Sequence, residues 1–406
     1  MSVRNTEQTT APLSRLEIRL DAIDHNVAEL RRLVGPDVTI CGVVKKNAYG
    51  LGAVTLAHRL LKAGCGMLAV YSPAEAEALN AGAVTAPILL YFPLRHLART
   101  EGLYRPAVAE RLHLSIHDPE QLEQLEQLGR TFGIRLPVHL FVDTGLSRGG
   151  LTLQQAGEIL TTQPQRAYTR LAGIMTHLAT APGDPARAQK QIERFDTLLE
   201  EHAQHIPADT LIHLANTYGT MRADTYHRRM VRPGLGLYGY GDGDLIGDPQ
   251  IDPPAKLRPC LRWVSRLVHV GHYPRHAAVG YGATHKLKRN SVLGLVPVGY
   301  ADGYPLGLSG RGSVGVRRPD SQERCDCPVL GRVNMDQITV DLTDLVKEAG
   351  SGAHDFDPSS LRGAEVEIYS DDPSAPHAVS RLAELAQSNA YELLCRLSPT
   401  LPRVYV

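Results

Sequence analysis

Residues 39–63 read TICGVVKKNAYGLGAVTLAHRLLKA, a short apolar run followed by a segment of helical spacing. The run is rich in β-branched residues and fits a buried strand, whereas residues 53–63 place their apolar side chains on one face of a helix. Two lysines, Lys45 and Lys46, stand at the end of the run. Neighbouring residues of a strand point to opposite faces, so only one of these lysines is expected to face the protein interior.

The same unit recurs through the first part of the chain, where eight apolar, β-rich runs are mostly separated by segments of helical spacing. Strand alternating with helix eight times predicts an α/β fold, a TIM-type (β/α)8 barrel. A doubly wound parallel sheet is the alternative, but it usually has fewer strands, and no break marks a reversal of strand order. The runs are TICGVVKK, GMLAVYS, APILLYFP, LHLSIHD, LPVHLFVDTG, LAGIMTHLAT, TLIHLANT and RMVRPGLGLYG.

The pattern of alternating strand and helix ends near residue 245. Residues 241–259, GDGDLIGDPQIDPPAKLRP, read as a linker because Gly, Pro and Asp dominate them. Short strand-like runs separated by turns then follow, with one helix predicted over 377–395. We therefore predict a barrel domain over 1–245 and a mostly-β C-terminal domain over 246–406. Exposed loops are expected at 317–327 and 351–360.

The composition bounds the function. The chain has 406 residues, and 43% of them are apolar, enough for a sizeable core. Lys plus Arg and Asp plus Glu both number 43, and this neutrality favours a small-molecule partner over nucleic acid or an anionic membrane. The sequence shows no signal-peptide pattern and no apolar run of membrane-spanning length, and its six cysteines are scattered. These features predict a cytoplasmic protein with reduced thiols.

Polar residues follow the predicted barrel strands, where the active sites of such barrels lie. A lysine at the end of a buried strand carries a desolvation cost when charged, which favours the neutral amine that Schiff-base chemistry needs. Lys45 fits that role, although two solvated loop lysines are at least as plausible from the pattern alone. Near Arg232, the glycine-rich PGLGLYG offers backbone N–H groups for a phosphate. Lysine and phosphate site together suggest pyridoxal phosphate. The predicted strand-end residues are Lys45, Tyr71, Tyr91, His117, Asp143, His177, Asn216 with Thr217, and Arg232.

The chain resembles the alanine racemase family of fold-type III pyridoxal-phosphate enzymes from about residue 16 to its C-terminus. Nine segments match in the family's order, a combination far more specific than any one of them. They are VVKKNAYGLG, HLFVDTGLSRGG, IMTHLAT, HLANTYG, VRPGLGLYG, VGYGATH, VPVGYADGYP, GRVNMDQITVDLT and YELLCRLSPTLPRVY.

The resemblance implies racemisation of L- and D-alanine by two bases, Lys45 and Tyr281, to supply D-alanine for cell-wall precursors. It implies that Lys45 binds the cofactor covalently and that a chain from Tyr281 through His177 to Arg232 stabilises the phenolate. It also implies a head-to-tail homodimer in which Tyr281 and Met335 serve the neighbouring subunit's site. The implied phosphate ligands are Tyr49, Thr217, Gly234, Leu235 and Tyr391. Arg232 would face the pyridine nitrogen, Arg148 and the Met335 N–H would hold the substrate carboxylate, and Tyr300 would lie at the entrance.

Two positions depart from the family pattern. Phe141 stands where many members carry a lysine that orients the arginine, so another group must position Arg148. Asn334 stands where alanine racemases usually have a cysteine, as in racemases of broader specificity. The alternative function is therefore a racemase that also accepts larger amino acids such as serine.

His139, His177 and His213 are candidates for a zinc site in a barrel hydrolase, but His139 and His213 lie early in their strands and are expected to pack inside the barrel, so no metal is predicted. A decarboxylase of the same fold type would need a GxxCxSxD stretch that the sequence lacks, and a non-catalytic cofactor carrier would lack the second domain. GLGLYG (234–239) fits a dinucleotide motif, but no helix follows it. Cys325 and Cys327 read as two exposed thiols in a loop.

Overall fold

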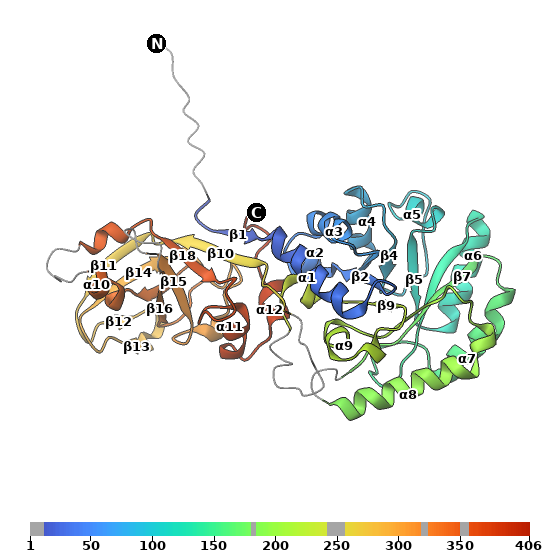
Figure 1. Cartoon of the computed structure of the whole chain (residues 1–406). Helices are drawn as coiled ribbons and strands as arrows, with labels where there is room; N and C mark the ends of the chain where they lie inside the picture. The colour runs from blue at the N-terminus through green and yellow to red at the C-terminus, as the bar shows by residue number, and fades with distance from the viewer. Residues whose placement is uncertain (1–11, 180–183, 242–255, 318–323, 350–356) are drawn as a thin grey trace, which may run out of the picture. The chain divides into compact units, whose positions relative to one another are not determined.

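A computed structural model describes residues 12–179, 184–241, 256–317, 324–349 and 357–406. The chain forms two compact units, each described here by itself (Figure 1). One unit comprises residues 20–258, and the other combines residues 1–19 with residues 259–406. The predicted domain junction at 245/246 and most of the predicted linker lie outside the described residues.

The unit of residues 20–258 is built around an eight-stranded parallel sheet with strand order β8-β7-β6-β5-β4-β3-β2-β9. Each strand falls within one of the eight apolar runs or begins just before it, because buried parallel strands need continuous apolar stretches. The strands are β2 (Thr39–Val43), β3 (Met67–Val70), β4 (Ile88–Leu90), β5 (Leu112–Ile116), β6 (Leu136–Phe141), β7 (Thr169–Met175), β8 (Leu211–His213) and β9 (Met230–Val231).

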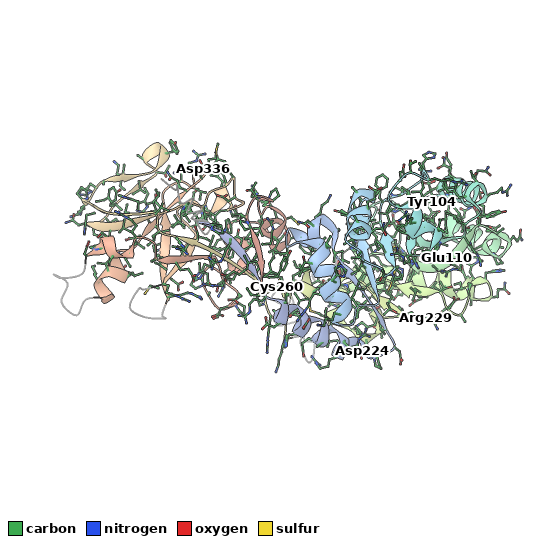
Figure 2. The ribbon with its side chains drawn as sticks, turned by 90° about the horizontal axis from the view of Figure 1, so that it is seen from above. Tyr104, Glu110, Asp224, Arg229, Cys260 and Asp336 are labelled. Carbon is green, nitrogen blue, oxygen red and sulfur yellow. The ribbon has the colours of Figure 1, made fainter. Side chains whose placement is uncertain are left out.

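Two backbone hydrogen bonds join the first and last strands of that order. Arg229 N donates to Ile212 O at 3.1 Å, and Arg232 N donates to Ala215 O at 2.8 Å. The sheet thus curls into a near-closed barrel, and the predicted fold class is confirmed. In Figure 2, Glu110 before β5 and Arg229 before β9 mark the end at which the strands begin.

Helices follow most of the barrel strands. Several begin at residues whose side chains accept a backbone N–H of the first turn, as Ser72 does for Glu75 and Asp118 does for Gln121. These local signals fix where the capped helices start and therefore where the loops before them end. The helices are α1 (Leu20–Val34), α3 (Ala53–Lys62), α4 (Pro73–Ala81), α5 (Tyr104–Val108), α6 (Pro119–Phe132), α7 (Leu153–Thr162), α8 (Pro185–Glu201) and α9 (Thr217–Arg222).

The other unit contains a nine-stranded mixed sheet of order β11-β14-β17-β16-β15-β18-β10-β1-β19. Strand β1 (Arg15–Ile18) pairs antiparallel with β10 and parallel with β19, which assigns this first strand to the same unit. The mostly-β character predicted for the C-terminal region is confirmed. The remaining strands are β10 (Leu261–Arg266), β11 (His269–Tyr273), β14 (Ser291–Val296), β15 (Ser313–Arg317), β16 (Arg324–Leu330), β17 (Ile338–Asp341), β18 (Glu365–Tyr369) and β19 (Arg403–Tyr405). A separate hairpin pairs β12 (Ala278–Val279) with β13 (His285–Lys286).

Two local predictions for this unit are wrong. The single helix expected over 377–395 is two helices, α11 (Val379–Leu385) and α12 (Ala390–Cys395), because Gln387 turns to φ +55° and Asn389 caps a new helix. Cys325 and Cys327 lie in β16, paired with Val316 and Val314, and not in a loop. Parts of both expected loops, 318–323 and 351–356, lie outside the described residues.

Among the described residues, no helix is both long and apolar enough to cross a lipid bilayer.

Candidate functional site

Polar side chains stand just beyond the carboxyl ends of the barrel strands. Parallel strands end on the same side, so the residues that follow them gather at one mouth of the barrel. The structure brings together the residues expected there from the sequence: Lys45 after β2, Tyr71 after β3, Tyr91 after β4, His117 after β5, Asp143 after β6, His177 after β7, Asn216 and Thr217 after β8, and Arg232 after β9.

The segment after β2 distinguishes the two lysines. Helix α2 (Lys45–Tyr49) contains a left-handed turn, with φ between 52° and 56° at each of residues 46–49. Lys46 is exposed, and its Nζ lies 5.7 Å from the centre of the Tyr71 ring, whereas Lys45 is partly buried. Left-handed conformations cost non-glycine residues roughly 1–2 kcal/mol each, and such strain is characteristic of functional sites.

Three segments converge beside that turn. The Thr217 Oγ1 accepts hydrogen bonds from Gly234 N at 3.0 Å and from Gly236 N at 3.1 Å. A Cβ on Gly234 would lie 2.3 Å from the Tyr49 Oη, so the backbone approaches the phenol closely. Leu235 begins a short 3₁₀ turn, η4 (Leu235–Tyr238). Hydroxyls and backbone amides gathered in this way are suited to a phosphate group.

The Arg232 guanidinium is buried and held from several sides. It donates to Thr176 O at 2.8 Å, and its nitrogens lie 2.6 Å from His213 Nδ1 and 3.5 Å from His177 Nδ1. Burial lowers the pKa of His177 well below its usual range, and the nearby charges of Arg232, Arg148 and Lys45 lower it further. The imidazole is therefore neutral, and three cationic side chains act on it at one place.

Arg148 lies on a loop that Asp143 shapes. The Asp143 Oδ1 accepts from the backbone amides of Gly145, Leu146 and Ser147. Phe141, at the position of the family's lysine, is buried and packs edge-on against His117 with ring centres 5.1 Å apart. The Phe141 side chain has no hydrogen-bonding atom, so it does not orient Arg148 as the family's lysine does, and another group must position the arginine.

Sequence reasoning missed His113, the outermost of three buried histidines inside the barrel. His113 Nδ1 lies 2.8 Å from His139 Nε2, and His139 Nδ1 lies 2.8 Å from His213 Nε2. The prediction that His139 and His213 pack inside the barrel is confirmed, since both are fully buried. The alternation in LHLSIH, which puts His113 and Ser115 on one face, was the available signal. No group of three or more His, Cys, Asp or Glu residues in the described ranges is arranged to hold a metal ion.

Three of the predicted site residues lie around a hollow in the unit of residues 1–19 and 259–406, called the second unit below. Tyr281, Tyr300 and Met335 line a hollow of about 580 Å³ together with Asn334 and Asp336, the last labelled in Figure 2. Tyr300 N donates to Asn334 O and Ala301 N to Met335 O, both at 3.0 Å, so the two loops hold each other. Tyr391 lies on α12 of the same unit.

Comparison with known proteins covers both units. The family described as "Alanine racemase, N-terminal domain" matches residues 18–242, and "Alanine racemase, C-terminal domain" matches residues 260–405. The chain belongs to the alanine racemase family. The alanine racemase of Symbiobacterium thermophilum is 33% identical over 391 residues, which are 96% of each chain.

Solved structures of alanine racemases share the fold. The enzyme of Streptomyces lavendulae is 29% identical, with a TM-score of 0.82 and 98% of each chain covered. The alanine racemase of Bartonella henselae, 26% identical with a TM-score of 0.78, covers 98% of this chain and 100% of its own and holds covalently bound pyridoxal phosphate. The predicted membership of the alanine racemase family is thus confirmed.

Proposed function

We propose that the protein is a pyridoxal-phosphate-dependent racemase that interconverts L- and D-alanine with Lys45 and Tyr281 as its two bases, supplying D-alanine for cell-wall precursors. The observation that carries the proposal is the barrel mouth. There, a partly buried lysine, a cluster of hydroxyls and amides, and a buried arginine lie at the ends of neighbouring strands.

The residues at that mouth fit the cofactor. Thr217, Tyr49 and the amides of Gly234 and Leu235 suit its phosphate, and a side chain on Gly234 would fill the space beside Tyr49. Tyr391 is the proposed fifth phosphate ligand. Arg232 would face the ring nitrogen and Lys45 would attach the cofactor. When bound, pyridoxal phosphate supplies an electron sink for the charge that develops at the substrate Cα.

Racemisation needs a proton acceptor on one face of the substrate and a donor on the other. We assign Lys45 to one face and Tyr281 to the other, each taking or returning the proton at Cα. A guanidinium has only N–H donors and is not deprotonated in proteins, so Arg232 would donate a hydrogen bond to the ring nitrogen and not a proton. This limits how far charge moves into the ring and favours return of the proton over side reactions such as transamination.

Substrate binding is assigned to groups from both units. Arg148 and the backbone N–H of Met335 would hold the carboxylate, and Tyr300 would lie at the entrance. A guanidinium suits this role because it offers a planar pair of donors that match the two oxygens of a carboxylate.

Lysine attachment is the direct test. Borohydride reduction of the purified holoenzyme fixes the cofactor to its lysine, and peptide mapping identifies the residue. We expect the label on Lys45 in the wild type. Lys45→Ala should lose both the label and nearly all of its turnover. The matched control Lys46→Ala, which changes an exposed side chain, should keep the label and near-normal turnover. Label on Lys46, or on no lysine, would refute the proposal.

A head-to-tail homodimer is part of the proposal. Tyr281 is 72% exposed and Met335 is 54% exposed, and both line the hollow of the second unit, so both are available to a partner subunit. If each site takes Lys45 from one subunit and Tyr281 from its partner, mixing unfolded Lys45→Ala and Tyr281→Ala chains and refolding them should restore about a quarter of the wild-type sites. Refolded mixtures as inactive as the separate variants would exclude a shared site.

Asn334 favours a second candidate, a racemase that also accepts serine. Its Oδ1 is buried without a hydrogen-bond partner among the described residues, in a residue that lines the hollow of the second unit. An amide beside the hollow can form a hydrogen bond with a substrate hydroxyl once the side chain turns toward it. Comparing kcat/KM for L-alanine and L-serine, in the wild type and in Asn334→Ala, tests this. A large preference for alanine that Asn334→Ala leaves unchanged would reject it.

A further inference from the structure

A continuous chain of hydrogen bonds runs through the barrel interior from Arg232 to His113. The Arg232 guanidinium lies 2.6 Å from His213 Nδ1, His213 Nε2 lies 2.8 Å from His139 Nδ1, and His139 Nε2 lies 2.8 Å from His113 Nδ1. All four residues are at least nine-tenths buried, with His113 the most exposed at 8%. Each inner imidazole therefore uses both of its ring nitrogens within the chain.

The chain has only one possible direction. A guanidinium has N–H donors and no acceptor, so His213 Nδ1 must accept from Arg232. Neutral His213 then carries its proton on Nε2 and donates to His139 Nδ1, and His139 in turn donates from Nε2 to His113 Nδ1. Hydrogen bonds aligned in this way polarise one another, so the acceptor at the far end strengthens the bond that holds Arg232.

The backbone of two strands makes room for the chain. The pairing of β6 with β7 shifts register between Val138 and His139, a bulge of the kind that re-aims a side chain. His139 consequently lies beside Gly173 of β7, where an added Cβ would be only 2.2 Å from His139 Nδ1. Only glycine at this position lets the imidazole reach His213.

The outer end of the chain is kept as an acceptor. Burial and, to a lesser extent, the charge of Arg170 lower the pKa of His113 to about 4. Arg170 is itself paired with Glu110, labelled in Figure 2, at 3.5 Å. His113 is therefore neutral near pH 7, and its Nδ1 keeps the lone pair that His139 needs.

We propose that His113 is a positioning residue: as the terminal acceptor of the chain Arg232→His213→His139→His113, it stabilises the direction that Arg232 sets and thereby holds the orientation of the Arg232 guanidinium at the barrel mouth. The inference deepens the proposed function, because its catalytic consequence depends on Arg232 facing the ring nitrogen of the cofactor. The tautomers themselves depend only on the chain.

Two substitutions separate this role from simple packing. In His113→Asn the side-chain oxygen stands near the place of Nδ1 and still accepts a hydrogen bond, whereas His113→Leu removes the acceptor. Leu114→Ala is the control for destabilisation, since Leu114 is the next residue of β5, is buried and points to the opposite face. Holoenzyme labelled with ¹⁵N-histidine reports the tautomers, and the assays measure kcat, KM and the ratio of transamination to racemisation.

We expect His139 and His213 to be protonated on Nε2 only, in the wild type and in His113→Asn. In His113→Leu the Nε2–H of His139 has no acceptor, so the bond between Arg232 and His213 weakens and we expect mixed tautomers. We expect kcat to fall about tenfold in His113→Leu with KM little changed, as for outer partners of catalytic groups, and to stay within about twofold in His113→Asn. Protonation on Nδ1 of either histidine in the wild type, or equal kinetics in His113→Leu and Leu114→Ala, would overturn the proposal. The tautomers of the wild type decide the matter even if His113→Leu does not fold, and they are readable whether or not alanine is the substrate.

Discussion

Gly173 and His139, on neighbouring barrel strands, leave no space between them for a methyl group. A Cβ on Gly173 would lie 2.2 Å from His139 Nδ1 and 2.6 Å from Cε1. Here the barrel accommodates a polar ring in its interior by omitting a side chain on the adjacent strand. The geometry of one glycine therefore decides whether the imidazole chain behind Arg232 can form.

Gly173→Ala is accordingly expected to destabilise the protein by more than the ~1–3 kcal/mol typical of an overpacked core, because the ring must move and its hydrogen bonds break. Urea unfolding measures the loss. Gly42→Ala is the matched control, since an added Cβ on β2 meets its neighbours at ordinary distances of 3.4–3.5 Å. Gly173→Ala should cost less unfolding free energy when His139 is also replaced by alanine. If the losses of the two single variants simply add in the double variant, this explanation is contradicted.

Thr217 gives a second prediction, for the proposed phosphate site. Thr217→Val keeps the shape of the side chain but removes the oxygen that accepts from the amides of Gly234 and Gly236. Each buried donor left without an acceptor costs roughly 1–3 kcal/mol of stability. Thr217→Ser keeps the oxygen. We expect Thr217→Val to weaken pyridoxal phosphate binding at least tenfold and Thr217→Ser to change it much less. Titrating each apoenzyme with pyridoxal phosphate measures these affinities. If Thr217→Val binds the cofactor as tightly as Thr217→Ser, Thr217 is not a phosphate ligand.

The barrel could be predicted from the sequence because its signals are local. Each buried parallel strand needs a short apolar run, and the eight runs correspond to β2–β9. The pairing of β1 with β10 could not be predicted in this way. Arg15 lies opposite Val264, and no local pattern indicates a partner so distant in the sequence.

Alternation along a strand could not decide between Lys45 and Lys46, because β2 ends at Val43 and the backbone then enters the left-handed turn. The histidine chain was also hidden from the sequence. His113, His139 and His213 each look like ordinary strand residues, and the bulge beside Gly173 that joins them depends on strand register.

The cysteines provide a third prediction. Burial raises the pKa of Cys65 to about 12 and also raises the pKa values of the Cys41, Cys260 and Cys327 thiols, and all four are buried. Thiols need their thiolate form to react. We expect no more than two thiols, Cys325 and Cys395, to react rapidly with a disulfide reagent near pH 8, and all six to react in urea. Four or more fast thiols in the native protein would contradict this.

A fourth prediction concerns acid stability of the second unit. Burial alone would raise the pKa of Glu367, but hydrogen bonds from His377 and Arg262 and the charges of Arg324 and Arg262 bring it from 4.5 down to about 2. A carboxylate with a depressed folded-state pKa stabilises the fold above its unfolded value and loses that contribution as the pH falls. The contribution, roughly 3 kcal/mol, should be complete above about pH 5 and disappear between about pH 4.5 and 2.

Glu367→Gln tests the origin of that stability. The amide keeps the size of the side chain but cannot pair as an anion with Arg262, whose Nε lies 2.5 Å from the carboxylate, or with Arg324 at 3.1 Å. We expect the variant to have a lower Tm at pH 7, and the difference from the wild type to narrow steadily as the pH falls from 5 to 3. Glu384→Gln, at an exposed pair on α11, is the control and should follow the wild type at every pH. A constant gap between Glu367→Gln and the wild type over this range would show that the side chain stabilises the sheet by packing and not by its charge.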